Sequence, residues 1–226
     1  MPMSVLVKIC GLATEAGLDA ALAHGADMVG FVFFDKSPRH ISLEQAASLG
    51  RQAAGQACKV LLTVNADDAT LAAAIAALDP ELLQLHGSET PERVASIRAR
   101  FGLPVMKAIG IGEAADLTSV PQFDAVADYL LFDAKPRQVS GRPGGNGESF
   151  DWSLLGMIET KKPWLLAGGL DPDNVAVALA QTRAQGVDVS SGVETASGKK
   201  DRDKIAAFVT AVRRADANLS LATRSG

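Results

Sequence analysis

A cysteine and an aspartate each stand at the end of a short apolar run, where their side chains could act as an acid–base pair. Cys10 follows SVLVKI, and Asp133 follows YLLF. A carboxyl group that closes an apolar strand is partly removed from water, which favours its protonated form and suits it to donate a proton. A thiol can accept a proton where positive charge favours the thiolate, and Lys8 lies on the same face of the same strand at about 7 Å.

Each of these two residues also has a purely structural interpretation. Asp133 could be a helix cap or a turn residue, and an isolated cysteine is often a small buried hydrophobic side chain. Cys58, beside another apolar run, is interpreted in that second way. Residue type alone leaves both alternatives open.

Two glycine-containing stretches in the second half of the chain could bind an anion. Gly168 and Gly169 lie in LLAGGLDPDNV, and Ser190, Ser191 and Gly192 lie in DVSSGVETASGKKD. Glycine lets backbone N–H groups approach an anion, and a helix N-terminus adds about half a positive charge. Either stretch alone could be a tight turn, but the two together predict a phosphate site.

Short apolar runs alternate with longer alanine-rich stretches of helical period. The runs are apolar on both faces, which is typical of buried parallel strands. We expect eight strands: SVLVKI (4–9), DMVGFVFF (27–34), KVLLTV (59–64), LLQLH (82–86), VMKAI (105–109), YLLFD (129–133), WLLA (164–167) and VDVS (187–190).

Several of the intervening stretches carry helix start signals. Ser42 and Gln45 have the spacing of a capping box, and Thr90 precedes a proline at the first helical position. Asp171 followed by Pro172 repeats that device. In the last stretch apolar residues recur at the spacing of one helix face, as Ile205, Phe208, Val209 and Val212.

Eight strands, each followed by a helix or a helix-sized segment, predict a single-domain (β/α)8 TIM barrel over residues 1–226. An open doubly wound sheet is the alternative, but it would need a GxGxxG motif after an early strand, and none is present. The long segment 134–149 after the sixth strand is expected to be a functional or mobile loop. The tail 215–226 is expected to fray.

Composition and charge exclude several classes of protein. The chain has 226 residues, 47% of them hydrophobic, and a domain of this length buries roughly 70% of the surface that its unfolded form exposes. A net charge of −4 gives no general reason to bind nucleic acid or an anionic membrane. The two cysteines suit a reducing compartment, and no run resembles a signal sequence or reaches the ~18 apolar residues of a membrane span. We expect a cytoplasmic protein without nucleic-acid or membrane partners.

In a parallel barrel all strands end at one face, and active sites lie there. The expected strand ends carry polar groups and glycines: Cys10, Phe34-Asp35, Asn65, His86-Gly87, Asp133, Gly168-Gly169 and Ser190-Ser191-Gly192. Asp188, two residues before Ser190, is a further inward-facing candidate. His24 and His40 show no metal-binding spacing with a cysteine or an acidic residue, so no metal site is expected.

Seven segments, in order along the chain, resemble the phosphoribosylanthranilate isomerase family. They are KICGL (8–12), FVFFDKSPRHIS (31–42), LLQLHGSE (82–89), LLFDAKP (130–136), GGNGESFDW (144–152), LAGGLDPDNV (166–175) and GVDVSSGVE (186–194). The match extends from Lys8 to about Phe208, and seven segments in register make it specific. The least typical stretch, 45–57, carries no candidate catalytic group.

The resemblance implies an Amadori rearrangement of N-(5-phosphoribosyl)anthranilate to 1-(2-carboxyphenylamino)-1-deoxyribulose 5-phosphate in tryptophan biosynthesis, without a metal or an organic cofactor. By motif, Cys10 would be the general base and Asp133 the general acid. Arg39 of SPR would face the anthranilate carboxylate, which a guanidinium can bind through two hydrogen bonds. Asp188 is expected to orient sugar hydroxyls or to restrain the phosphate loop. His86 is expected either to contact the substrate or to bond loop carbonyls.

Other kinds of protein fit less well. A ribulose-phosphate epimerase would need His and Asp metal ligands at strand ends, and an indole-glycerol-phosphate synthase would need a Lys/Glu pair and a longer N-terminal segment. A non-catalytic phosphosugar-binding barrel would keep the glycine loops but lose the acid or the base, whereas Cys10 and Asp133 are both present. The sequence leaves open whether the protein is a monomer or a homodimer, whether it accepts the related aminoaldose of histidine synthesis, and how far the loop 134–149 closes.

Overall fold

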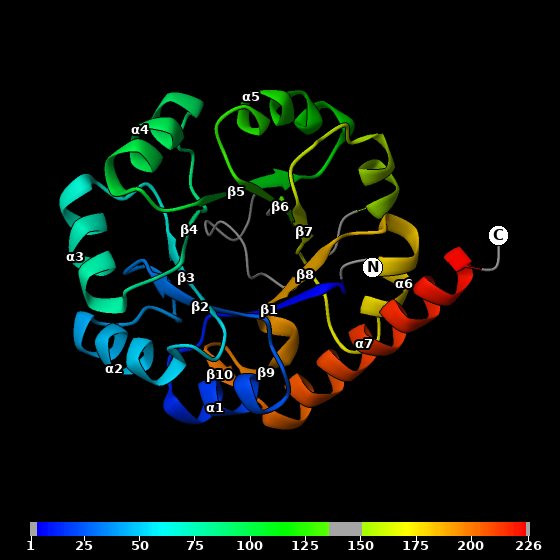
Figure 1. Cartoon of the computed structure of the whole chain (residues 1–226), viewed down its shortest axis with the longest axis horizontal. Helices are drawn as coiled ribbons and strands as arrows, with labels where there is room; N and C mark the ends of the chain where they lie inside the picture. Colours follow the sequence, from blue (N-terminus) through cyan, green and yellow to red (C-terminus); the bar gives the residue numbers. More distant parts are fainter. Residues whose placement is uncertain (1–3, 136–150, 225–226) are drawn as a thin grey trace.

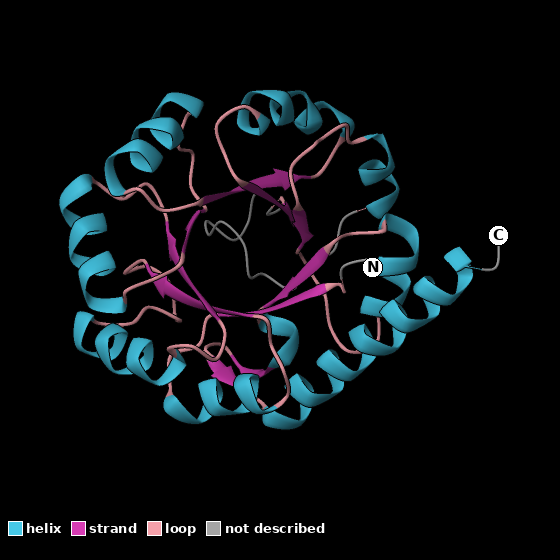
Figure 2. Ribbon diagram, in the orientation of Figure 1, coloured by secondary structure: helices cyan, strands magenta, loops and turns pink. Residues whose placement is uncertain are grey.

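Eight parallel strands form a closed ring in the computed structural model, which describes residues 4–135 and 151–224. Each strand pairs with its neighbours in sequence, and the eighth strand pairs with the first to close the barrel. Helices surround this ring (Figures 1 and 2). The predicted (β/α)8 barrel is therefore confirmed. The strands are β1 (Leu6–Cys10), β2 (Met28–Phe33), β3 (Cys58–Thr63), β4 (Leu82–Leu85), β5 (Val105–Ile111), β6 (Tyr129–Ala134), β7 (Trp164–Leu166) and β8 (Gly186–Val189).

Two of the predicted helix starts are confirmed in detail. The Ser42 hydroxyl accepts a hydrogen bond from the Gln45 backbone N–H, and the Ser42 N–H donates to the Gln45 side chain. Thr90 caps the fourth helix, with Pro91 at its first position. The helices are α1 (Glu15–Ala23), α2 (Leu43–Ala53), α3 (Asp68–Leu78), α4 (Pro91–Phe101), α5 (Val120–Asp124), α6 (Val175–Thr182) and α7 (Arg202–Arg224).

The helix after β7 begins later than the sequence pattern indicated. The Asp171 carboxylate accepts hydrogen bonds from the backbone N–H groups of Asp173 and Asn174, and these bonds close a separate turn. Helix α6 begins only at Val175, with Asn174 as its N-cap residue. The prediction that Asp171 caps this helix is therefore wrong.

Short elements that the sequence analysis did not anticipate complete the layer around the strands. One 3-10 helix, Ala114–Ser119, precedes α5, and another, Trp152–Met157, precedes β7. After β8 come a 3-10 turn (Ser191–Val193) and a hairpin of β9 (Glu194–Ala196) and β10 (Lys199–Lys200). The expected loop 134–149 lies outside the described residues from 136 onward.

Helix α7 continues through the tail that was expected to fray. Ala215 and Leu219 pack against the core one and two turns beyond Val212, so the apolar stripe extends further than it was traced. The Asp216 carboxylate also accepts a hydrogen bond from the Val5 backbone N–H, at 3.2 Å. These contacts explain the helical conformation up to Arg224, while the fraying of the tail stays a prediction.

Apolar side chains fill both sides of the strand ring. The larger cluster lies between strands and helices and includes Phe31, Phe132 and Phe208, all fully buried. A second cluster, inside the ring, includes Val60 and Leu131. The lumen is therefore a packed core, and the strand ends are left for polar groups. Within residues 4–135 and 151–224, no helix has both the length and the apolarity needed to cross a bilayer.

Candidate active site

A cavity lies where the carboxyl ends of the strands meet. Its empty space, part of which is open to solvent, is about 750 Å³. Strands β1 and β6, which carry the predicted base and acid, are separated around the ring by β7 and β8. The structure brings both of these groups to the one cavity. Of the predicted site residues, the cavity is lined by Cys10, Arg39, His86, Asp133, Gly168, Gly169, Asp188 and Ser190.

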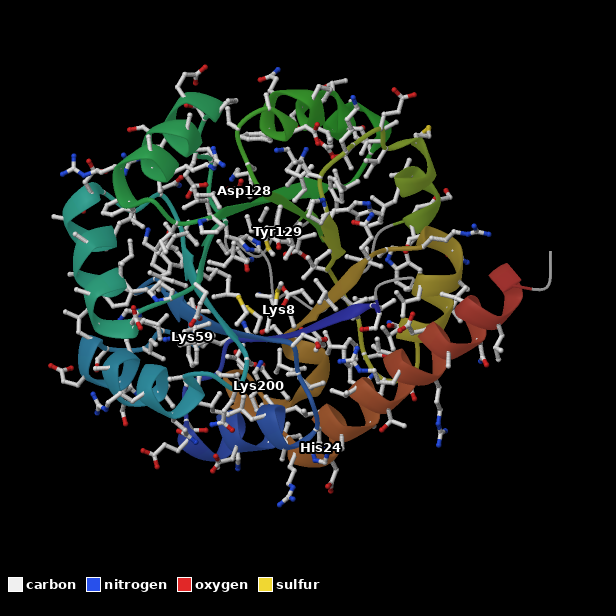
Figure 3. The ribbon with its side chains drawn as sticks, in the orientation of Figure 1. Lys8, His24, Lys59, Asp128, Tyr129 and Lys200 are labelled. Atoms are coloured by element: carbon white, nitrogen blue, oxygen red, sulfur yellow. The ribbon has the colours of Figure 1, made fainter. Side chains whose placement is uncertain are left out.

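Cys10 is the last residue of β1 and is 4% exposed. Lys8, two residues earlier, is fully buried inside the ring (Figure 3), and its Nζ donates a hydrogen bond to Asp188 Oδ1 at 2.9 Å. Burial raises the pKa of the Cys10 thiol, because a thiolate loses its hydration there, and the opposing charge of Lys8 is outweighed. The positive charge expected beside Cys10 is therefore in place, but the thiol remains the favoured form.

Lys8 itself keeps its charge in the centre of the barrel. Burial alone would lower the pKa of its ammonium group, but the neighbouring Asp188 and Cys10 raise it above the usual value. A glycine on β2 makes room for this group: a Cβ atom at Gly30 would lie 2.9 Å from Cys10 Sγ and 3.1 Å from Lys8 Nζ. No role for Gly30 could be predicted from the sequence, because the spacing of the residues shows nothing of this contact.

Asp133 lies one residue before the end of β6 and is 6% exposed. Its Oδ1 accepts a hydrogen bond from the Ala134 backbone N–H at 2.8 Å, and its Oδ2 lies 3.1 Å from His86 Nε2. The other ring nitrogen of His86, Nδ1, lies 2.9 Å from Gln84 Nε2. His86 therefore bonds two side chains rather than the loop carbonyls considered from the sequence.

Arg39, in the loop after β2, is held by a carboxylate from the β9–β10 hairpin. Its Nε and Nη2 donate to Glu194 Oε1 and Oε2, each at 2.8 Å. Lys200 Nζ also donates to Glu194 Oε1, at 2.7 Å, and to the Ser190 backbone carbonyl, at 3.0 Å. Since two cations share one carboxylate, this group of residues has a net positive charge beside the cavity.

Glu194 and Lys200 were not among the site residues predicted from the sequence. Glu194 ends the segment GVDVSSGVE, but nothing in the spacing indicates a partner 155 residues earlier in the chain. The contact also depends on Gly11, where a Cβ atom would lie 2.4 Å from Arg39 Cδ. Only the folded hairpin and the bare backbone at Gly11 bring the guanidinium and the carboxylate together.

The loops after β7 and β8 pack closely against each other, as the predicted phosphate site requires. Gly168 and Gly169 have φ angles of +86° and +64°, which favour glycine. A Cβ atom at Gly192 would lie only 2.0 Å from the Leu170 carbonyl oxygen. Ser190 lines the cavity, whereas Ser191 and Gly192 follow it in the next turn without lining the cavity themselves. Phosphate binding by these residues stays a prediction.

The described residues contain no cluster of side chains that could bind a metal ion. Across the described ranges, no three His, Cys, Asp or Glu side chains are grouped so that they could hold an ion. The chemistry that the cavity supports with its own side chains is proton transfer, through a thiol and a carboxyl group.

Comparisons with known proteins agree on one family. A protein-family model described as N-(5'phosphoribosyl)anthranilate (PRA) isomerase matches residues 7–211 of the chain. The N-(5'-phosphoribosyl)anthranilate isomerase of Beijerinckia indica subsp. indica is 68% identical over 212 residues, which is 94% of this chain and 96% of that protein.

Solved structures agree with the sequence comparison. Phosphoribosyl anthranilate isomerase from Thermotoga maritima is similar with a TM-score of 0.83 and 34% identity, over 93% of this chain and 99% of that one. A phosphoribosyl anthranilate isomerase in complex with reduced 1-(o-carboxyphenylamino)-1-deoxyribulose 5-phosphate has a TM-score of 0.79 and 32% identity, with the same coverage of 93% and 99%. The chain belongs to the N-(5'-phosphoribosyl)anthranilate isomerase family.

Proposed function

We propose that this chain catalyses the Amadori rearrangement of N-(5-phosphoribosyl)anthranilate to 1-(2-carboxyphenylamino)-1-deoxyribulose 5-phosphate, a step of tryptophan biosynthesis. The observation that carries the proposal is that Cys10 and Asp133 line one cavity from two separate strands. Membership of the family supports the reaction, and the related isomerase in complex with the reduced compound supports the substrate class.

Asp133 acts first, as the general acid. It donates its proton to the furanose ring oxygen while the bond from that oxygen to C1 breaks. The nitrogen lone pair forms a double bond to C1, so the product of this step is an open-chain iminium ion and Asp133 is left as a carboxylate. The contact of its Oδ2 with His86 Nε2 supports this step, because a hydrogen bond donated by the ring would stabilise that carboxylate.

Cys10 acts second, as the general base. The iminium ion acidifies the C2–H bond, and the Cys10 thiolate removes that proton. The electron pair of the C2–H bond forms the C1–C2 double bond and returns the iminium electrons to nitrogen. The resulting enolamine takes up a proton at C1 and loses the proton of its C2 hydroxyl, which gives the ketone. The buried Lys8 ammonium favours the thiolate in this step, against the cost of burial.

The remaining cavity residues suit the other parts of the substrate. We assign the anthranilate carboxylate to Arg39, and apolar side chains that also line the cavity, including Val32, Leu62 and Val64, suit an aromatic ring. Asp188 also lines the cavity and accepts a hydrogen bond from Lys8, so its other oxygen is available for a sugar hydroxyl.

The phosphate group is assigned to the loops after β7 and β8. Gly168, Gly169 and Ser190 line the cavity, and the adjoining Ser191 and Gly192 complete the turn that packs against the first loop. Backbone N–H groups of such glycine-rich turns bind phosphate in many barrels. Lys200 beside Ser190 adds positive charge at the same end.

The direct test is to incubate the purified chain with phosphoribosylanthranilate and to follow the loss of the anthranilate-type fluorescence. Rapid enzyme-dependent loss, with the deoxyribulose phosphate identified as the product, is the expected result. Unchanged fluorescence at high enzyme concentration would refute the substrate. We also propose a cytoplasmic location, on the strength of the two free cysteines. The oligomeric state, monomer or homodimer, stays a prediction, to be settled by sedimentation in solution.

A further inference from the structure

A chain of three side chains extends from the barrel interior to the candidate acid. Gln84 and His86 occupy inward-facing positions two residues apart, on β4 and at its end. Gln84 Nε2 lies 2.9 Å from His86 Nδ1, and His86 Nε2 lies 3.1 Å from Asp133 Oδ2. Gln84 is completely buried and does not line the cavity, so it reaches the cavity only through His86.

The first of these contacts fixes which nitrogen of His86 carries the proton. An amide nitrogen can only donate, so His86 Nδ1 must accept the hydrogen bond from Gln84. In a neutral ring the proton is then on Nε2, which donates to Asp133 Oδ2. This arrangement suits Asp133 as a carboxylate, the form in which it is left after it donates its proton.

The orientation of the Gln84 amide depends on His86 alone. Its Oε1 is buried and has no hydrogen-bond partner among the described residues. A half turn of the amide would exchange Oε1 and Nε2 and let Oε1 accept a proton from His86 Nδ1–H. His86 Nε2 could then accept the proton of a protonated Asp133. The two amide orientations therefore match the two protonation states of Asp133.

We propose that Gln84 is a positioning residue for the acid step, which holds His86 in the tautomer that offers Asp133 a matching hydrogen bond. The inference rests on the proposed role of Asp133 as general acid. Among the described residues, the other charged groups near these three residues or the cavity are in ion pairs. These pairs are Lys107–Glu89, Lys8–Asp188, Arg39–Glu194 and Lys200–Glu194.

The first experiment measures the tautomer without relying on activity. Nitrogen NMR of protein labelled at histidine distinguishes a protonated from an unprotonated ring nitrogen, and His86 is assigned by its loss in His86→Ala. We expect Nε2–H in the wild type at a pH where Asp133 is ionised. In Gln84→Met, which removes the donor with little change in size, that preference should be lost. An unchanged His86 tautomer in Gln84→Met would overturn the proposal.

The second experiment is a double-mutant cycle on kcat. Gln84→Met should lower kcat about 10-fold, the size expected for a residue that orients a functional side chain, and should leave KM within about twofold. In a His86→Ala background the same change should cost nothing further. A 10-fold loss in both backgrounds would mean that Gln84 only packs in the barrel, and the proposal would be wrong.

Two controls keep the outcomes distinct. Leu82→Met changes the preceding inward position of β4, and it should leave both the tautomer and kcat unchanged. If Gln84→Met does not fold, Gln84→Glu replaces it, because its carboxylate can only accept and should move the proton to His86 Nδ1. Full activity of Asp133→Asn would instead refute the role of Asp133 as general acid. The NMR result would still decide whether Gln84 sets the tautomer of His86.

Discussion

Arg39 and Glu194 join the loop after β2 to the hairpin after β8 through two hydrogen bonds of 2.8 Å each. The carboxylate takes the Nε–H and one N–H of Nη2, so the two N–H groups of Nη1 and the second N–H of Nη2 are left to meet a second carboxylate from the cavity. The pair therefore fixes the direction of the Arg39 fork before a substrate arrives. A fixed fork loses less side-chain entropy on binding than a free arginine would.

The first prediction concerns this pair. Glu194→Gln keeps the size of the side chain but replaces one acceptor oxygen by a donor, which repels the guanidinium. A hydrogen bond to a charged group contributes about 1.5–3 kcal/mol, so we expect KM for phosphoribosylanthranilate to rise on the order of 10-fold, with a smaller change in kcat. Steady-state fluorescence kinetics, with exposed Glu15→Gln as the control, measures both constants. A lower KM would show that Glu194 competes with the substrate for Arg39.

The second prediction tests the base. Cys10→Ala should lower kcat by at least ~100-fold, as removal of a positioned acid or base does. Cys58→Ala is the matched control, since Cys58 begins β3 and does not line the cavity. Single-turnover fluorescence decay separates loss of chemistry from loss of binding. Near-normal turnover in Cys10→Ala would remove Cys10 from the mechanism.

The third prediction tests the acid. Asp133→Asn keeps the shape of the side chain but has no acidic proton, so kcat should again fall by at least ~100-fold. Affinity for the reduced product analogue should change much less, because Asp133 is assigned no part in holding the phosphate or the carboxylate. Calorimetric titration with that analogue measures the affinity. If binding and turnover fall together, Asp133 serves substrate binding rather than proton donation.

The fourth prediction is the pH dependence of kcat/KM, whose sign follows from the protonation states of Cys10 and Asp133. The reactive form has one proton shared by the pair, with Cys10 as thiolate and Asp133 as acid. That proton is lost only when the pH passes the pKa of Cys10, which burial raises above its usual value. The alkaline fall of kcat/KM should therefore come at a higher pH than for an ordinary thiol.

In the variant without the acid, the reaction rate should rise with pH instead of falling. In Asp133→Asn the residual reaction needs only the thiolate, so its rate should rise with pH up to the same Cys10 pKa. The pH dependence of Cys10 alkylation by iodoacetamide gives that pKa independently, with Cys58 followed by mass spectrometry in the same sample. A residual rate that is flat across this range would contradict the assignment of Cys10 as base.

Much of the site could be predicted because strand periodicity and the parallel-barrel rule act together. Once eight buried strands are recognised, their ends must meet at one face, so Cys10, His86 and Asp133 are expected to line one cavity. The role of Gly30 could not be predicted, since it depends on how closely β2 approaches Cys10 Sγ. The balance between burial and the charge of Lys8 at Cys10 likewise depends on the depth of both groups in the barrel.

The loops were predicted less well, for a physical reason. Helix α6 begins at Val175 because the Asp171 carboxylate accepts hydrogen bonds within a preceding turn. An aspartate that closes a turn and one that caps a helix look the same in the sequence. Glu194 meets Arg39 only because the hairpin after β8 lies against the loop after β2. Contacts between segments so far apart in sequence have no local pattern from which they could be predicted.

The fifth prediction concerns the predicted phosphate site. Gly192→Ala would place a methyl group 2.0 Å from the Leu170 carbonyl oxygen if nothing moved, so the loops after β7 and β8 must separate. Backbone N–H groups that converge on a phosphate would then move apart. Each such charged hydrogen bond contributes about 1.5–3 kcal/mol, so inhibition by inorganic phosphate should weaken on the order of 10-fold. Gly156→Ala is the control, because a Cβ atom there meets nothing within 4 Å. Equal phosphate inhibition of the two variants would place the phosphate elsewhere in the cavity.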